Sequence, residues 1–347
     1  MSALSAGTDS AIEVDGLVKT YGTGDRAVTA LAGLSFAVAR GAIFGLLGPN
    51  GAGKSTTLKI LTTQIRPSAG TARVGGFDVV RQPLEVRRRI AVVIQEQAAD
   101  LLLSARDNLT GFARFHGLSS ADIRARADRV LDDFGLTAHA SQKVQDMSGG
   151  FRRRVQVAKI FMVDTPIVFL DEFSTGMDPL LKRAVMAALR AEAQRGRTIV
   201  LTTQILSEAE ELCDDILIVN RGREVARGDL PALKLLSNGV YEVSMTFDRL
   251  PDGIAAELAE LAPLRLDINR TTVDIAVKGR ESEVLALVSR LAGRGQILRV
   301  EIGGASLEDI FVELTSGQAP STRPAQDPRS GHPSTPVEHE RHSGRAR

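Results

Sequence analysis

The sequence predicts an α/β protein with a largely parallel sheet, followed by a smaller α+β domain. Short apolar runs such as residues 42–47 and 167–170 alternate with helical stretches, a pattern typical of parallel βα units. After residue 239 the pattern becomes β-α-β-β-α-β-α, which is compatible with a ferredoxin-like domain. A chain of 347 residues has room for both parts.

The core elements follow from where apolar periodicity changes and where turn residues interrupt it. The expected strands cover residues 12–14, 17–21, 31–38, 42–47, 71–74, 90–94, 167–170, 198–202 and 216–219. The expected helices cover residues 55–63, most of 100–145, a stretch after Ser148, 180–195 and 207–213.

The second domain has strands expected at residues 241–245, 264–268, 272–277 and 297–302, and helices at 253–261, 281–291 and from Ser306. Ser306 and Asp309 have the spacing of a helix capping box. The remaining sequence is rich in Pro, Ser and Arg and is too poor in large apolar residues to fold. We therefore expect a flexible N-terminus at 1–10, a core domain at 11–237 with a helical subdomain at about 100–163, a small domain at 238–316 and a disordered tail at 317–347.

Composition limits the function classes. A net charge of +1 gives no overall field for nucleic acid, and the basic run of Arg152, Arg153 and Arg154 lacks interleaved aromatic residues, so it is expected to be solvated or to face a subunit. The single cysteine, Cys213, excludes an intrachain disulfide and fits a reducing compartment. No stretch approaches the ~20 apolar residues of a spanning helix. A role at a membrane would therefore be that of a peripheral subunit.

A phosphate-binding loop is expected between the apolar run at 42–47 and the next helix. It matches the pattern G-x-x-x-x-G-K-[ST] in its required strand–helix context and consists of Gly48, Pro49, Asn50, Gly51, Ala52, Gly53, Lys54, Ser55 and Thr56. Glycines allow backbone N–H groups to turn toward an anion at a helix N-terminus. We expect Lys54 to reach the β- and γ-phosphates of ATP and the Ser55 hydroxyl to ligate Mg²⁺.

Two carboxylates, Asp171 and Glu172, end the apolar strand at 167–170. Successive side chains of a strand point to opposite faces, so the two have different expected roles. Asp171 is the candidate Mg²⁺ ligand, acting through water. Glu172 is the candidate base that orients and deprotonates the attacking water.

Between these two motifs, Met147-Ser148-Gly149-Gly150-Phe151 resembles the L-S-G-G-Q signature of ATP-binding-cassette (ABC) ATPases. In that family the segment contacts the γ-phosphate held by the opposite subunit of a head-to-tail homodimer. The resemblance therefore implies that Ser148, Gly149 and Gly150 bind ATP held by a second copy. A serine and two glycines at a helix start suit that contact, because they present a hydroxyl and N–H groups to an anion.

The other family landmarks occur in order, and the resemblance covers about residues 12–228. Tyr21 resembles the aromatic residue that stacks on adenine. Gln95 resembles the glutamine that joins Mg²⁺ and nucleotide to the helical segment facing the transporter. The run Ser174-Thr175-Gly176-Met177-Asp178 resembles the loop that contacts the partner subunit, which makes Thr175, Gly176 and Asp178 its expected contact residues. The fold implied is that of a P-loop NTPase.

The sequence departs from the family pattern at three positions. Phe151 replaces the usual glutamine of the signature, and Phe173 replaces the usual proline after the Asp-Glu pair. Gln204 stands where the family has its switch histidine. A glutamine amide can still donate to a γ-phosphate oxygen but cannot become cationic. We therefore expect Gln204 to take part in hydrolysis that is slower or differently gated.

Residues 45–63, 70–80, 201–204 and 306–315 are together similar to daunorubicin/doxorubicin-resistance-type ABC ATPases. That resemblance implies a homodimeric ATPase on the cytoplasmic face of the membrane, which drives drug or antibiotic export through a separate multi-span permease. An importer subunit remains an alternative. So does a non-transport ABC ATPase of the repair, translation or iron–sulfur type, although the chain lacks a coiled-coil insertion and a second cassette.

Overall fold

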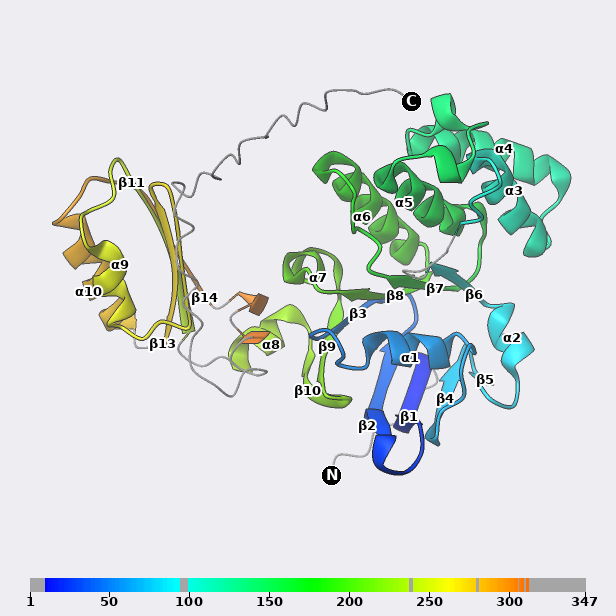
Figure 1. Ribbon diagram of the computed structural model, residues 1–347, viewed down its shortest axis with the longest axis horizontal. Coiled ribbons are helices and arrows are strands. Elements are labelled where there is room, and N and C mark those ends of the chain that lie inside the picture. The colour runs from blue at the N-terminus through cyan, green and yellow to red at the C-terminus, as the bar shows by residue number, and fades with distance from the viewer. Residues whose placement is uncertain are drawn as a thin grey trace, which may run out of the picture. The chain divides into compact units, whose positions relative to one another are not determined.

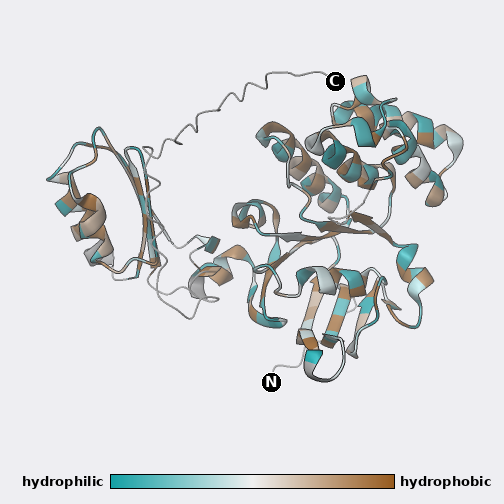
Figure 2. Ribbon diagram, viewed as in Figure 1, coloured by the Kyte–Doolittle hydropathy of each residue, from teal (hydrophilic) through white to brown (hydrophobic). Residues whose placement is uncertain are grey.

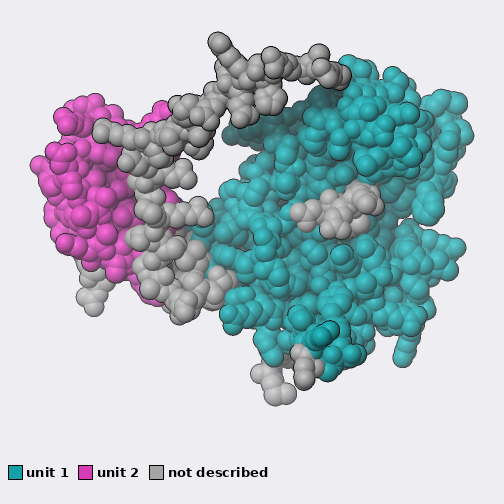
Figure 3. Space-filling model, in the orientation of Figure 1, with its two compact units in different colours: residues 1–240, 304–318 teal, residues 241–303, 319–347 magenta. Residues whose placement is uncertain are grey.

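The computed structural model describes residues 10–93, 99–236, 240–278, 281–304, 306–308 and 310–311. The chain divides into two compact units (Figure 3). The first contains the described residues up to Val240 together with those from Gly304 to Phe311, and the second contains Tyr241–Gly303.

A six-stranded sheet forms the centre of the first unit. Its strands, in spatial order, are β10 (Arg223–Gly228), β9 (Asp215–Asn220), β3 (Ile43–Leu47), β8 (Thr198–Thr203), β7 (Ile167–Asp171) and β6 (Ile90–Val93). All neighbours run parallel except β10, which is antiparallel to β9. The predicted parallel α/β core is therefore confirmed.

Burial of the sheet on both faces explains the continuous apolar runs of its strands. Every residue of β3, β7 and β8 is buried, and these strands are largely brown in Figure 2. Along β3, Ile43 and Leu47 join one core cluster whereas Phe44 and Leu46 join another, since side chains alternate between the two faces.

One face of this sheet packs toward a four-stranded antiparallel sheet (Figure 1). That sheet has the order β2 (Val28–Ala39), β1 (Ser10–Tyr21), β4 (Ala69–Val74) and β5 (Phe77–Asp78). Helix α1 (Lys54–Leu61) packs against both sheets through Leu58, Ile60 and Leu61. The turn η1 (Gly24–Arg26) joins β1 to β2, and α2 (Pro83–Arg87) precedes β6.

The other face is covered by helices (Figure 1). They comprise α3 (Ala105–Phe115), α4 (Ser120–Asp133), α5 (Gly149–Ala158), α6 (Pro179–Gln194), α7 (Leu206–Leu212) and α8 (Leu230–Leu236), with the short turns η2 (Thr137–His139), η3 (Val144–Asp146) and η4 (Lys159–Met162). The hydroxyls of Ser104 and Ser119 cap α3 and α4 by accepting from the N–H groups of Asp107 and Asp122. These caps explain where the predicted helical region begins its helices.

The second unit is the predicted ferredoxin-like domain. Its elements are β11 (Val240–Phe247), α9 (Ile254–Ala259), β12 (Arg265–Asn269), β13 (Thr272–Lys278), α10 (Glu281–Ala292) and β14 (Ile297–Gly304). The sheet order is β12-β13-β11-β14, which is the order expected for a β-α-β-β-α-β unit of this type. Val243, Met245 and Phe247 of β11 and Leu258 of α9 lie in its core.

The predicted boundary of the second domain at 238–316 is wrong at its C-terminal end. Leu307 is fully buried in the core of the first unit, where Phe311 also packs, and the Leu307 N–H donates to Glu210 Oε1 at 2.7 Å. The segment from Ser306 returns to the first unit because that unit offers its apolar side chains a core. The predicted tail at 317–347 and residues 1–9 of the predicted flexible N-terminus lie outside the described residues. Among the residues that are described, no helix is long and apolar enough to cross a membrane.

Candidate functional site

The glycine loop connects β3 to α1 as predicted. Two of its glycines allow close backbone approach. A Cβ on Gly48 would lie 2.3 Å from the carbonyl oxygen of Val219. Gly53 has a φ of +110°, and its Cβ would lie 2.7 Å from the carbonyl oxygen of Ala30. Glycine at these positions therefore lets the loop pack tightly before α1 begins.

A cavity of about 520 Å³ opens over this loop. Its lining combines residues from distant parts of the sequence: Val28, Thr29, Ala30, Asn50, Gly51, Ala52, Gly53, Lys54, Ser55, Thr56, Glu172 and Gln204. The structure thus brings seven predicted loop residues together with Glu172 and Gln204. The contribution of Val28, Thr29 and Ala30 on β2 was not predicted, because nothing in their sequence indicates a ligand.

Lys54 is buried beneath the loop. Its ammonium donates to the carbonyl oxygens of Gly48 at 2.6 Å and Pro49 at 3.1 Å. These two residues therefore position Lys54 and are absent from the cavity lining. Burial lowers the pKa of Lys54, and the carboxylates of Glu172 and Asp171 partly offset that effect.

The two predicted carboxylates take different positions at the end of β7. Asp171 is buried, and its Oδ1 accepts a hydrogen bond from the Thr202 hydroxyl on the neighbouring strand β8. Glu172 lies in the cavity wall with a φ of +48°, a conformation that few non-glycine residues adopt. The Glu172 N–H donates to the Thr202 carbonyl at 3.0 Å. Thr202 thereby aligns both residues.

Arg153 of α5 holds the turn that contains Glu172 by hydrogen bonds to its backbone. Its guanidinium donates to the carbonyl oxygens of Asp171 at 2.7 Å and Phe173 at 2.9 Å, and also to that of Glu172. The expectation that Arg153 is solvated or faces a subunit is therefore wrong, since only 6% of the residue is exposed. The basic run gave no indication of which arginine points inward, because three consecutive helix residues project in different directions.

Gln204 follows β8 and contacts the candidate base. Its Nε2 donates to Glu172 Oε1, and both side chains face the cavity. That this amide also donates to a γ-phosphate oxygen stays a prediction; in the described structure it donates to the carboxylate. An amide in this place holds one oxygen of Glu172 without carrying charge.

Of the two other predicted nucleotide contacts, Tyr21 lies in the described structure and Gln95 does not. Tyr21, at the end of β1, is 42% exposed, and its hydroxyl lies 3.4 Å from Thr56 Oγ1. The aromatic ring is therefore near the end of the glycine loop, although Tyr21 is absent from the cavity lining. Gln95 lies outside the described residues.

The signature residues lie outside this cavity. Ser148 caps α5, its Oγ accepting from the Phe151 N–H at 3.4 Å. A Cβ on Gly150 would lie 3.1 Å from the Gly176 carbonyl oxygen, whereas one on Gly149 would meet nothing within 4 Å. The signature and the predicted dimer loop are thus adjacent within one chain.

An ion pair strengthens this connection. Arg154 of α5 contacts Asp178 at 2.6 Å, and Asp178 caps α6 by accepting from the Leu181 N–H. Thr175 reaches back toward the carboxylate turn, its N–H lying 3.4 Å from the Glu172 carbonyl oxygen. The start of α5, the dimer loop and the Glu172 turn therefore form one connected group.

A buried carboxylate that sequence reasoning missed links the same region to α7. Glu208 is 1% exposed. It accepts from Ser174 Oγ at 2.5 Å and Thr203 Oγ1 at 2.9 Å, and it pairs with Lys182 of α6 at 2.6 Å. Its partners come from the loop after β7, the end of β8 and α6. A glutamate on a short amphipathic helix is usually expected to be solvated, so the burial of Glu208 was not predictable from spacing.

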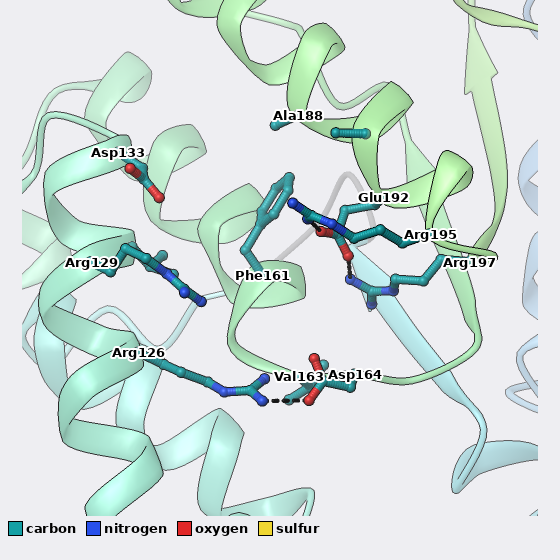
Figure 4. A pocket seen from close by; sticks show the side chains of 12 residues that line it. Arg126, Arg129, Asp133, Phe161, Val163, Asp164, Ala188, Glu192, Arg195 and Arg197 are labelled. Carbon is teal, nitrogen blue, oxygen red and sulfur yellow. Dashed lines mark hydrogen bonds and ion pairs between the residues drawn. The ribbon is translucent and has the colours of Figure 1, made fainter.

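A second cavity of about 590 Å³ lies between α4, the segment before β7 and α6 (Figure 4). Four arginines line it, and three of them form ion pairs in the described structure. Arg126 of α4 pairs with Asp164 before β7. Arg195 and Arg197 both pair with Glu192 near the end of α6. None of the nucleotide motifs lines this cavity.

Comparison with known proteins agrees with the geometry. The profile of the family "ABC transporter" matches residues 31–175. The chain is 38% identical over 308 residues to the daunorubicin resistance ATP-binding protein DrrA3 of Streptomyces coeruleorubidus, a match covering 88% of this chain and 96% of that protein. It is also 38% identical over 309 residues to the Nod factor export ATP-binding protein I of Paraburkholderia xenovorans strain LB400, covering 88% of this chain and 97% of that protein.

Solved structures show the same cassette. An ATP-binding subunit of an ABC transporter superposes with a TM-score of 0.61 at 30% identity, covering 65% of this chain and 93% of its own. A dimeric cassette in a post-hydrolysis state, bound to ADP and Pi, superposes with a TM-score of 0.59 at 25% identity, covering 63% of this chain and 98% of its own. The predicted resemblance is therefore confirmed: this chain belongs to the ABC transporter family, as an ATP-binding subunit that hydrolyses ATP.

Proposed function

We propose that this chain energises the export of a small organic molecule through a separate membrane subunit, and that Glu172 and Gln204 perform the hydrolytic step. The observation that carries the catalytic assignment is the cavity in which Glu172 and Gln204 face the glycine loop. The export assignment is supported by relatives whose names specify daunorubicin resistance and Nod factor export. The substrate class is thus an organic compound rather than an ion.

The loop Gly48 to Thr56 binds the ATP phosphates through its N–H groups and the positive end of α1. Lys54 is held by two carbonyl oxygens within the loop. A ligand phosphate offers that ammonium a stronger partner than a neutral carbonyl does. Tyr21 stacks on the adenine, which its exposure and its contact with Thr56 permit.

The residues present fit a magnesium ion. Mg²⁺ usually binds through one or two carboxylates, waters and substrate phosphates, and hard oxygen donors are what this chain offers. Ser55 lines the cavity at the start of α1, and Asp171 is a buried carboxylate with one oxygen engaged by Thr202. Ser55 and Asp171 would hold the ion, with Gln95 as the third predicted contact. When bound, Mg²⁺ neutralises charge on the phosphates.

Hydrolysis depends on Glu172 accepting a proton from the attacking water. The hydrogen bond from Gln204 fixes one carboxylate oxygen in the cavity that the phosphate loop also lines. Arg153 and Thr202 hold the backbone of the same turn. This chain thereby keeps the base oriented, so that little reorganisation is needed when ATP and water bind.

A second copy completes the site. Ser148, Gly149 and Gly150 lie outside the cavity of their own chain. Apart from its chain neighbours and its own helix backbone, no described atom lies within 4 Å of a Cβ built on Gly149. These residues therefore contact ATP held by the other copy, with Thr175, Gly176 and Asp178 beside them. A related cassette forms a dimer in its solved structure. The homodimer closes because ATP completes contacts available only in the closed state.

The membrane partner docks near the start of the helical region. Leu101, Leu102 and Leu103 are consecutive and 47%, 69% and 42% exposed. They lie just before α3, close in sequence to Gln95, so movement at the nucleotide reaches a surface that is apolar enough to bind another protein. We infer from this docking that the chain works on the cytoplasmic face of the membrane, beside its permease.

The test uses variants with matched controls. Lys54→Ala should abolish ATP binding, whereas Lys59→Ala on the exposed face of α1 should not, as measured by fluorescent-nucleotide titration.

Glu172→Gln should bind ATP, hydrolyse it about 10²–10⁴-fold more slowly and accumulate as an ATP-bound dimer. The exposed Glu224→Gln serves as its control. Unchanged phosphate release by Glu172→Gln would remove Glu172 as the base. Recovery from membranes without a multi-span partner would contradict the transport assignment.

A further inference from the structure

Strand β14 exposes apolar side chains at the edge of the ferredoxin-like unit. In the described sheet its one neighbour is β11. Leu298, Val300 and Ile302 are 61%, 39% and 44% exposed and, at alternate positions, share one face of the sheet. An edge strand of eight residues with such a stripe is a template for pairing with another strand. The unpaired edge of β14 can therefore bind a strand of complementary sequence.

The sequence of β14 is complementary to itself. If two copies pair antiparallel about Val300, Leu298 of one copy lies opposite Ile302 of the other. Arg299 of each copy then lies opposite Glu301 of the other. Apolar side chains thus face each other at both ends of the stripe, and opposite charges face each other at positions 299 and 301. Apolar pairs and opposite-charge pairs both stabilise antiparallel strands.

Other registers lose these contacts. A shift of one residue in either direction places Leu298 and Val300 opposite a charged residue or a glycine. A shift of two residues places Arg299 opposite Arg299, or Glu301 opposite Glu301, and like charges directly opposite are destabilising. The pattern therefore selects a single two-fold register. Within one chain Arg299 and Glu301 already pair, but at 68% and 60% exposure this ion pair is weak, so exchanging it costs little.

We propose that two copies of this chain associate through β14, which joins their ferredoxin-like sheets edge to edge about a two-fold axis at Val300. The partner is a second copy because β14 itself supplies both the apolar and the oppositely charged residues that this register places across the edge. The contact needs no nucleotide. It is thus separate from the ATP-dependent contact of the cassettes, and the failure of either contact can be observed without the other.

Cysteine cross-linking tests the register. Opposed residues of antiparallel strands have Cα atoms about 4.5–5.5 Å apart, within the range of a disulfide, so Val300→Cys should form a covalent dimer of the full chain under mild oxidation. Leu298→Cys and Ile302→Cys are position-matched controls. Each lies about 13 Å from its own copy in this register, so neither should cross-link alone, whereas the double variant should. The native Cys213 is buried and does not interfere.

Charge exchange tests the complementarity. Without nucleotide, Arg299→Glu and Glu301→Arg should each weaken the dimer about tenfold, because each creates two like-charge pairs. The double exchange should restore the dimer. Sedimentation velocity of the nucleotide-free protein at low salt measures all three variants. Equal cross-linking at positions 298, 300 and 302, a monomeric native protein, or no rescue by the double exchange would each overturn the proposal. So would occupation of the edge by another protein or by another segment of this chain.

Discussion

Gln204 places a neutral amide beside Glu172, the proposed catalytic carboxylate, at the position where the family resemblance leads one to expect a histidine. Its hydrogen bond to Glu172 Oε1 fixes the orientation of that oxygen. An amide does not titrate in the physiological range, so Gln204 itself adds no ionisation to this contact. The amide should therefore add no pH dependence to the orientation of the proposed base.

Substitution of Gln204 tests this idea. Gln204→Ala should lower kcat about 10–100-fold, the cost of losing one hydrogen bond to a charged group, with little effect on the Kd for ATP. Gln204→His should retain activity and add an ionisation near pH 6.5 to the kcat profile, because imidazole titrates there. Phosphate release measured from pH 5.5 to 8.5 distinguishes the variants. Identical profiles for Gln204→His and the native chain would contradict the role of the amide.

Lys159 shows how burial shapes stability at a single residue. Burial lowers its pKa from 10.5 to about 8, with a smaller opposing effect of Asp100. Below pH 8 the ammonium is charged in both the folded and unfolded states, and its burial cost is fully present. Between about pH 8 and 10.5 the folded state loses the proton first. The free energy of unfolding therefore gains a contribution that rises with pH across that window.

Lys159→Met should remove the burial cost while keeping the apolar stem. We expect the free energy of unfolding at pH 7 to increase by about 2–3 kcal/mol, and the rise between pH 8 and 10.5 to disappear. Urea denaturation at several pH values measures both effects. The exposed Lys143→Met is the control and should leave the pH profile unchanged. A pH dependence that survives in Lys159→Met would assign the effect to another group.

At the scale of elements, Glu208 connects α7 to the loop after β7, the end of β8 and α6. Because Thr203 immediately precedes Gln204, and Ser174 follows two residues after Glu172, this carboxylate joins the backbones that carry both proposed catalytic groups. It touches no reacting atom and acts as a positioning residue. The pair with Lys182 compensates its buried charge.

Glu208→Gln should reduce the free energy of unfolding by about 2–4 kcal/mol, because it leaves Lys182 without its counter-charge. It should also lower kcat with little change in KM for ATP, since Gln204 loses its support. In a double-mutant cycle, Glu208→Gln with Lys182→Met should lose less stability than the two single variants combined. Additive losses, or a native kcat at a temperature where the variant is folded, would contradict this coupling.

Strand β1 illustrates an element whose boundaries depended on pairing. The sequence indicated separate runs at 12–14 and 17–21, because Gly16 interrupts the apolar pattern. The structure joins them into one strand with register shifts between Val14 and Leu17. Gly16 accommodates the irregularity with a φ of +56°, and its N–H donates to Ser35 Oγ at 2.8 Å. A bulge of this kind satisfies the backbone locally but depends on a partner strand distant in sequence.

At the scale of the whole molecule, the chain leaves the first unit at Val240 and returns to it after the ferredoxin-like unit. Leu307 and Ile310 are 0% and 1% exposed, and Leu307 bonds to Glu210. The ferredoxin-like unit is thus an insertion within the first unit, and the residues after it complete that unit's packing.

Truncation after residue 240 should therefore destabilise the cassette. Loss of Leu307 and Ile310 removes two buried apolar side chains, which lowers the free energy of unfolding of the first unit by about 3–6 kcal/mol. Replacing residues 241–303 by a flexible linker, which retains Leu307 and Ile310, should preserve most of that stability. Thermal denaturation with ATP-binding readout compares the two. Equal stability of both shortened chains would show that the returning segment contributes nothing.

The sequence alone determined the cassette, the glycine loop, the Asp171–Glu172 pair and the ferredoxin-like order, because each depends on local spacing or periodicity along a few consecutive residues. Only the tertiary structure decided that Gln204 bonds to Glu172, that Arg153 and Glu208 are buried supports of that site, and that Leu307 closes the first unit. These contacts join residues distant in the chain. Whether a charged side chain is solvated or buried is set by what packs against it, and spacing along one helix carries no information about that neighbour.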